Sequence, residues 1–66
     1  MTLRDLRKAK QLTQCELAAS VGVTQAYICA LESGRRKNPS VNVVRKIAIV
    51  LDVKTANVLD ALDDAS

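Results

Sequence analysis

The sequence contains no histidine and only two cysteines, Cys15 and Cys29. A structural zinc site needs four cysteine or histidine ligands, and neither a Cys-x-x-Cys pair nor a Cys/His cluster is present, so we expect no metal. Histidine-based acid–base or nucleophilic catalysis is excluded as well, and no pair of carboxylates marks a catalytic cleft. We therefore expect neither an enzyme nor a cofactor.

Aromatic side chains are almost absent, since the sequence has no Phe, no Trp and one Tyr. Any core must be built from Leu, Val, Ile and Ala, and a chain of this length buries only about 60% of the surface that its unfolded form exposes. We expect residues 1–66 to form a single domain with a thin aliphatic core. The lone aromatic residue, Tyr27, is conspicuous because such a core does not require it.

Long apolar runs are missing too. No run approaches the ~18 residues of a membrane span, and the first ten residues, MTLRDLRKAK, lack the apolar core of a secretory signal. We expect a cytoplasmic protein with free thiols and no membrane partner. A chain of this length leaves no room for a ligand-sensing second domain, so no small-molecule ligand is expected.

Charge is distributed unevenly along the chain. Residues 1–51 carry nine Lys or Arg and three acids, a net charge of +6, whereas residues 52–66 carry a net charge of −3. This asymmetry is typical of a basic body that faces a polyanion. Charge alone does not distinguish this interpretation from ordinary solvated surface charge, and the two are equal alternatives.

The spacing of apolar residues predicts an all-α domain with no strand. Two capping boxes, Thr2 with Asp5 and Thr13 with Glu16, mark two helix starts. Gly22 predicts a tight connection with positive φ between the second and third helices, which must then cross steeply. The expected helices span about residues 3–10, 13–20, 24–33, 41–51 (with Ser40 as the cap) and 55–62.

Three stretches carry a family resemblance: LTQCELA at 12–18, VGVTQAYI at 21–28 and LESGRR at 31–36, with Arg7 upstream and Asn38-Pro39-Ser40 downstream. Together they make the chain resemble the phage repressor and Cro family (lambda-repressor-like, XRE-type) of helix-turn-helix proteins over about residues 3–62. The resemblance implies a compact five-helix fold, a recognition helix at about 24–33, and regulation of transcription by binding double-stranded DNA.

The segment 24–33 supports the same function on physical grounds. Ile28 and Leu31 predict one buried side, while the other side is small and nearly uncharged and is followed by a basic loop. Such a helix fits the major groove while neighbouring cations meet phosphates. The alternative is an ordinary amphipathic helix. The resemblance implies that five residues contact bases: Thr24, Gln25, Ala26, Tyr27 and Ala30. Among them Gln25 is implied to be the principal reader of adenine.

For Tyr27, partial packing under the helix at 13–20 is an equal alternative to a DNA contact. The resemblance further implies phosphate contacts, which position the protein on DNA without specifying sequence. The residues concerned are Gln14, Ser33, Arg35, Arg36, Lys37, Asn38 and Ser40. For Gln14, which lies in the first turn of its helix, the alternative is a plain solvated side chain. Arg7 and Glu32 match a family ion pair, which we interpret as mainly structural.

A homodimer on a palindromic operator is expected, with an interface formed by Ile49, Val58, Leu59 and Leu62. Asp52 stands where the family favours Gly, which predicts either a left-handed residue or a different end of the fourth helix. Other possibilities are an antitoxin or a protein-interaction module with the same fold. A redox switch at Cys29 or Cys15 is a further hypothesis.

Overall fold

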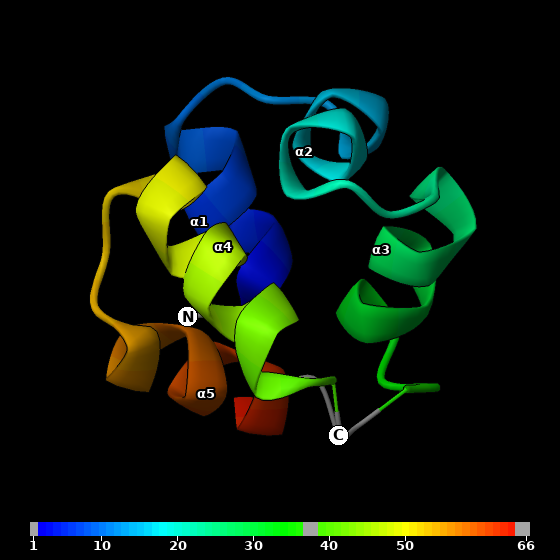
Figure 1. Cartoon of the computed structure of the whole chain (residues 1–66). Helices are drawn as coiled ribbons and strands as arrows, with labels where there is room; N and C mark the ends of the chain where they lie inside the picture. The colour runs from blue at the N-terminus through cyan, green and yellow to red at the C-terminus, as the bar shows by residue number, and fades with distance from the viewer. Residues whose placement is uncertain (1, 37–38, 65–66) are drawn as a thin grey trace.

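The computed structural model of the chain describes residues 2–36 and 39–64. These residues form five helices and no strand (Figure 1), which confirms the all-α five-helix prediction. The helices are α1 (Leu3–Ala9), α2 (Gln14–Val21), α3 (Gln25–Glu32), α4 (Val41–Leu51) and α5 (Thr55–Asp64). Within the described ranges no helix is both long enough and apolar enough to cross a bilayer.

Both capping boxes are confirmed. The Thr2 hydroxyl accepts the N–H of Asp5 and the Asp5 carboxylate accepts the N–H of Thr2, at 3.2 and 3.0 Å. Thr13 and Glu16 make the same reciprocal pair at the start of α2. Each box satisfies amide groups that have no partner inside the helix, so these local sequences determine where α1 and α2 begin.

The turn between α2 and α3 depends on Gly22, whose φ of +85° lies in the left-handed region. The N–H groups of Gly22 and Val23 both donate to the carbonyl of Ala18, at 2.8 and 2.9 Å. A Cβ atom added to Gly22 would have no neighbour within 4 Å. The turn therefore requires glycine for its backbone conformation and not for space.

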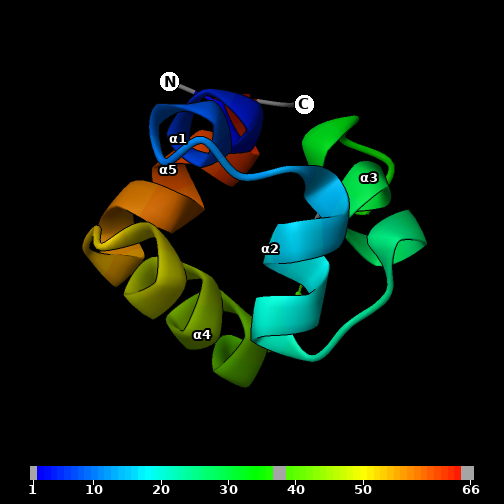
Figure 2. The same ribbon diagram turned by 90° about the horizontal axis from the view of Figure 1, so that it is seen from above.

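Every helix contributes to one aliphatic core, and α2 packs against both α3 and α4. Figure 2 shows the helices around this core, with α1 next to α5 and with α3 at the periphery. The bulkiest fully buried side chains are Leu3, Leu17, Ile28, Leu31, Ile47, Leu51 and Val58. Burial of Ile28 and Leu31 holds one side of α3 against the domain and leaves the opposite side outward.

The predicted dimer interface needs a correction. Val58 is fully buried and Leu62 is 7% exposed, because both side chains belong to the domain's own core. They are therefore not available to a second subunit in this structure. Of the four predicted residues, Ile49 and Leu59 do face outward, with 79% and 50% of their surface exposed.

Asp52 ends α4 in the left-handed conformation, with φ 55° and ψ 46°. Its N–H and that of Val53 satisfy carbonyl groups of the last turn, those of Ile49 and Ala48. The left-handed alternative for this position is confirmed, and it turns the chain towards α5 without a glycine.

Candidate nucleic-acid interface

The outward side of α3 is open over the described residues and consists of small, uncharged side chains. Thr24 caps the helix by accepting the N–H of Tyr27 at 3.1 Å. Thr24, Gln25 and Ala26 are exposed in the first turn, while Tyr27 and Ala30 are half-buried. Of the five predicted base-contacting residues, three are thus exposed and two are half-buried.

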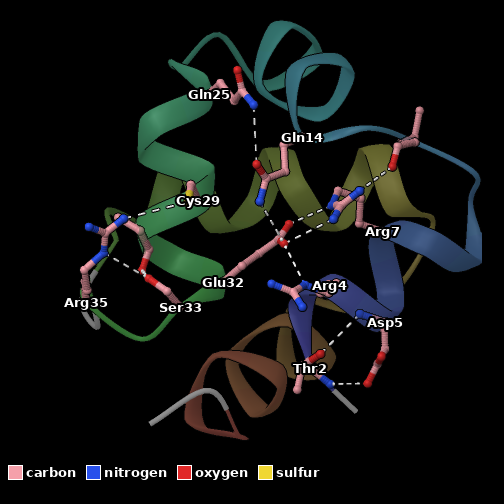
Figure 3. A network of polar contacts seen from close by, with 12 residues as sticks. Thr2, Arg4, Asp5, Arg7, Gln14, Gln25, Cys29, Glu32, Ser33 and Arg35 are labelled. Carbon is pink, nitrogen blue, oxygen red and sulfur yellow. Dashed lines mark hydrogen bonds and ion pairs between the residues drawn. The ribbon is translucent and has the colours of Figure 1, made fainter.

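The C-terminal end of α3 is held by an ion pair with α1 (Figure 3). Nε of Arg7 lies 2.7 Å from Oε2 of Glu32, and Nη2 of Arg7 lies 3.2 Å from Oε1. Arg7 also donates through Nη1 to the carbonyl of Leu12, at 2.6 Å. Both residues are 8% exposed. The structure thus brings together the two partners that the family resemblance pairs. This contact fastens α3 to α1.

Glu32 collects further donors besides Arg7. Nε of Arg4 lies 3.5 Å from Oε1 of Glu32, and Nε2 of Gln14 donates to the same oxygen at 3.2 Å. Burial raises the pKa of Glu32, but the hydrogen bonds from Arg7 and Gln14 and the charge of Arg7 outweigh burial, and the pKa is lowered. The carboxylate is therefore charged at neutral pH.

From Glu32 a chain of hydrogen bonds runs outward to the first residue of α3. Oε1 of Gln14 accepts from Nε2 of Gln25 at 3.5 Å, and Oε1 of Gln25 accepts from Sγ of Cys15 at 3.0 Å. Figure 3 shows Gln14 between Glu32 and Gln25. Gln14 is half-buried and bonded at both ends of its amide, so it is not a plain solvated side chain.

Sequence reasoning did not find the part played by Cys15. The interpretations open to it were a filler residue and a redox switch, and no local motif links it to Gln25, ten residues further on. Only the crossing of α2 and α3 brings the thiol to the amide. Both cysteines are free thiols in the structure.

The end of α3 carries a second group of contacts, made by the two arginines of the basic loop. Nε of Arg35 donates to the Ser33 hydroxyl at 3.1 Å, and its Nη2 lies 3.8 Å from Sγ of Cys29. The guanidinium carbon of Arg36 lies 4.7 Å from the ring centroid of Tyr27, a cation–π contact. Both arginines are exposed, and both lie against α3.

Tyr27 therefore has two neighbours at once. Its half-buried ring packs against the core cluster, as the packing alternative expects, and the same ring supports Arg36. No sequence signal predicts this second contact, since the two residues lie nine positions apart across a helix end.

The remaining predicted phosphate contacts fall into two groups. Ser33 and Ser40 are exposed, and the Ser40 hydroxyl accepts the N–H of Val43 at 3.3 Å as the cap of α4. Lys37 and Asn38 lie outside the described residues. Among the described residues, the exposed groups Ser33, Arg35, Arg36 and Ser40 thus lie around the end of α3 and the start of α4.

A helix-turn-helix family model matches residues 3–57 of the chain. This match covers all five predicted base contacts, the turn at Gly22 and the Arg7–Glu32 pair. The chain belongs to the helix-turn-helix family, of the XRE type.

Several relatives carry names that describe regulators. The chain is 39% identical over 59 residues to the uncharacterized HTH-type transcriptional regulator RghRB of Bacillus subtilis strain 168, covering 89% of the chain and 42% of that protein. It is 34% identical over 58 residues to the HTH-type transcriptional regulator SinR of the same organism, covering 88% and 52%. It is 35% identical over 51 residues to the ImmF control region 10 kDa protein of Bacillus phage phi105, covering 77% and 56%. The chain thus spans about half the length of these relatives.

Proposed function

We propose that the chain binds double-stranded DNA sequence-specifically and regulates transcription, with α3 as the helix that enters the major groove. The observation that carries the proposal is the exposure of Gln25 in the first turn of α3, between the exposed, small and neutral Thr24 and Ala26. Short neighbours allow close approach to base edges, and a glutamine amide has the donor and acceptor that pair with adenine.

The groups around this helix suit the phosphate backbone. Arg35 and Arg36 are exposed and held beside α3 by Ser33 and Tyr27. Guanidinium groups that are already placed lose less side-chain freedom when they bind phosphate. The names of the two Bacillus subtilis relatives, both of which are those of transcriptional regulators, point in the same direction.

The second part of the proposal is a homodimer on a palindromic operator. Ile49 on α4 and Leu59 on α5 are large apolar side chains with 79% and 50% of their surface exposed. On a palindromic operator, the two copies of α3 in such a dimer would lie about 34 Å apart, one turn of DNA. Half-sites at that spacing are the expected operator.

Selection of bound duplexes from a random library tests the proposal directly. We expect a two-fold symmetric consensus with half-site centres about one helical turn apart. Gln25→Ala should abolish preference at one position in each half-site while leaving non-specific affinity unchanged. If the folded protein enriches no duplex at low ionic strength, the DNA-binding proposal is wrong and a protein partner becomes the leading alternative.

Salt dependence tests the role of the basic loop. Each phosphate contact contributes roughly −0.9 to the slope of log K against log salt, so Arg36→Ala should make the slope of a dimer less negative by about 2. Lys54→Ala is the matched control, because it removes the same charge from the α4–α5 connection, which lies on the far side from α3 in Figures 1 and 2. Equal slopes for the two variants would contradict the assignment.

A further inference from the structure

A glutamine amide that reads a base has two orientations, which exchange its donor and its acceptor. Which one Gln25 adopts decides which base edge it matches. The hydrogen bonds around Gln25 end at a group with no such freedom, the carboxylate of Glu32. An ionised carboxylate only accepts hydrogen bonds, and this one is already held by Arg7 at 2.7 Å.

The orientation follows step by step from that carboxylate. Gln14 must turn its NH2 group towards Glu32, where Nε2 lies 3.2 Å from Oε1. The Gln14 oxygen then faces Gln25 and can only accept, so Gln25 presents Nε2 to it at 3.5 Å. The oxygen of Gln25 is left facing Cys15, which must be the donor in the contact of 3.0 Å.

We infer that Cys15 is a positioning residue for Gln25, and that its thiol, together with the Glu32–Gln14 chain, locks the amide in the orientation that selects adenine over guanine. The inference rests on the proposed DNA-binding function and deepens it. The thiol donates to the outer end of this chain of hydrogen bonds, and the charged carboxylate of Glu32 lies at its inner end. Without it, the oxygen of Gln25 has no protein partner among the contacts of the described residues, and the amide is held only by its 3.5 Å contact with Gln14.

The locked amide has one hydrogen-bonding site left on each atom. Nε2 keeps one N–H, because the other is donated to Gln14, and Oε1 keeps one lone pair, because the other accepts from Cys15. Adenine offers an acceptor at N7 and a donor at N6, which match this pair, whereas guanine offers acceptors at both N7 and O6. Facing guanine, the locked oxygen would oppose O6. Rotation that avoids this clash would break the contact with the thiol.

The first test needs no DNA. In the free protein, Cys15→Ala should lower the NMR order parameter of the Gln25 side-chain amide, and Cys15→Ser, which keeps a donor, should preserve it. Ser20→Ala is the matched control, since Ser20 is an exposed hydroxyl residue on the same helix. Cys15 is itself exposed, so the melting temperature should be similar in all of these variants.

The second test measures the ratio of dissociation constants for guanine and adenine at the operator position that Gln25→Ala defines. We expect Cys15→Ala to reduce this ratio about fivefold, the value of one modest hydrogen bond, without changing discrimination at other positions. Cys15→Ser should restore the ratio to within about twofold of the wild type, a rescue that the same hydrogen bond predicts.

The outcomes separate the inference from the function on which it rests. If the wild-type protein selects an operator but Cys15→Ala discriminates as the wild type does, the inference is wrong and the DNA-binding proposal stands. If Cys15→Ser loses discrimination as Cys15→Ala does, the donor role is overturned. If no duplex is selected, the function fails, while the amide order parameter still reports whether the thiol holds Gln25.

Discussion

Arg7 and Glu32 join the first helix to the end of the third through two hydrogen bonds, of which the shorter, between Nε and Oε2, is 2.7 Å. Both residues are 8% exposed, so removing one partner leaves the other charge buried. We expect Arg7→Met to lower the free energy of unfolding by about 3 kcal/mol, because Arg4 and Gln14 compensate only part of the loss. Urea unfolding followed by circular dichroism measures this change.

A double variant is the control for the ion pair. Arg7→Met combined with Glu32→Leu removes both charges, and apolar replacements of a buried pair are often neutral. The double variant should therefore be more stable than Arg7→Met alone. If the double variant has the lower free energy of unfolding of the two, the attraction between Arg7 and Glu32 itself stabilises the domain.

Acid should weaken the fold through the same carboxylate. The pKa of Glu32 is below its ordinary value of 4.5, so its charged form stabilises the folded state. That contribution is fully present above about pH 4.5 and is lost as the pH falls through the lower folded-state pKa. The urea concentration at the unfolding midpoint of the wild type should decrease as the pH is lowered through this window.

Glu32→Gln should show a shallower acid dependence than the wild type. Some dependence should remain, because hydrogen bonds from the backbone and hydroxyl of Thr2 and Thr13 also lower the pKa values of Asp5 and Glu16. Parallel curves for the variant and the wild type would mean that Glu32 is not the group responsible.

Asp52 marks a position where the fold tolerates an unfavourable backbone. Its φ of 55° is left-handed, a conformation that costs a residue with a Cβ atom more than it costs glycine. Asp52→Gly should raise the free energy of unfolding by about 0.5 to 1 kcal/mol, since the exposed contact with Lys10 at 3.9 Å contributes little. Asp52→Ala keeps the Cβ and should give no such gain. Thermal melts of both variants provide the comparison.

Ile49 offers a test of the proposed dimer. Its side chain is 79% exposed on α4, so Ile49→Lys should leave the fold intact and shift sedimentation towards the monomer. Val41→Lys is a matched control, an apolar-to-lysine change on the same helix at a side chain that is 65% exposed. Sedimentation that is unchanged by Ile49→Lys, or shifted equally by Val41→Lys, would refute the interface.

The sequence by itself determined the local structure of this protein. The boxes at Thr2 and Thr13, the caps at Thr24 and Ser40, and the turn at Gly22 each involve residues only a few positions apart. Contacts of that kind depend only on residues close together in the sequence, so five helices, their approximate starts and the outward side of α3 were predictable. The family resemblance added the Arg7–Glu32 pair, which no local pattern contains.

Only the tertiary structure decided which side chains meet across helices. The apolar repeat of the last helix does not distinguish its own core from a partner's surface, so Val58 and Leu62 were assigned to an interface although they are buried. The contacts of Cys15 with Gln25 and of Arg36 with Tyr27 likewise depend on how α2 crosses α3 and how the chain leaves α3. Such contacts follow from the packing of the whole core, which fixes the relative placement of helices that hydrophobic spacing leaves open.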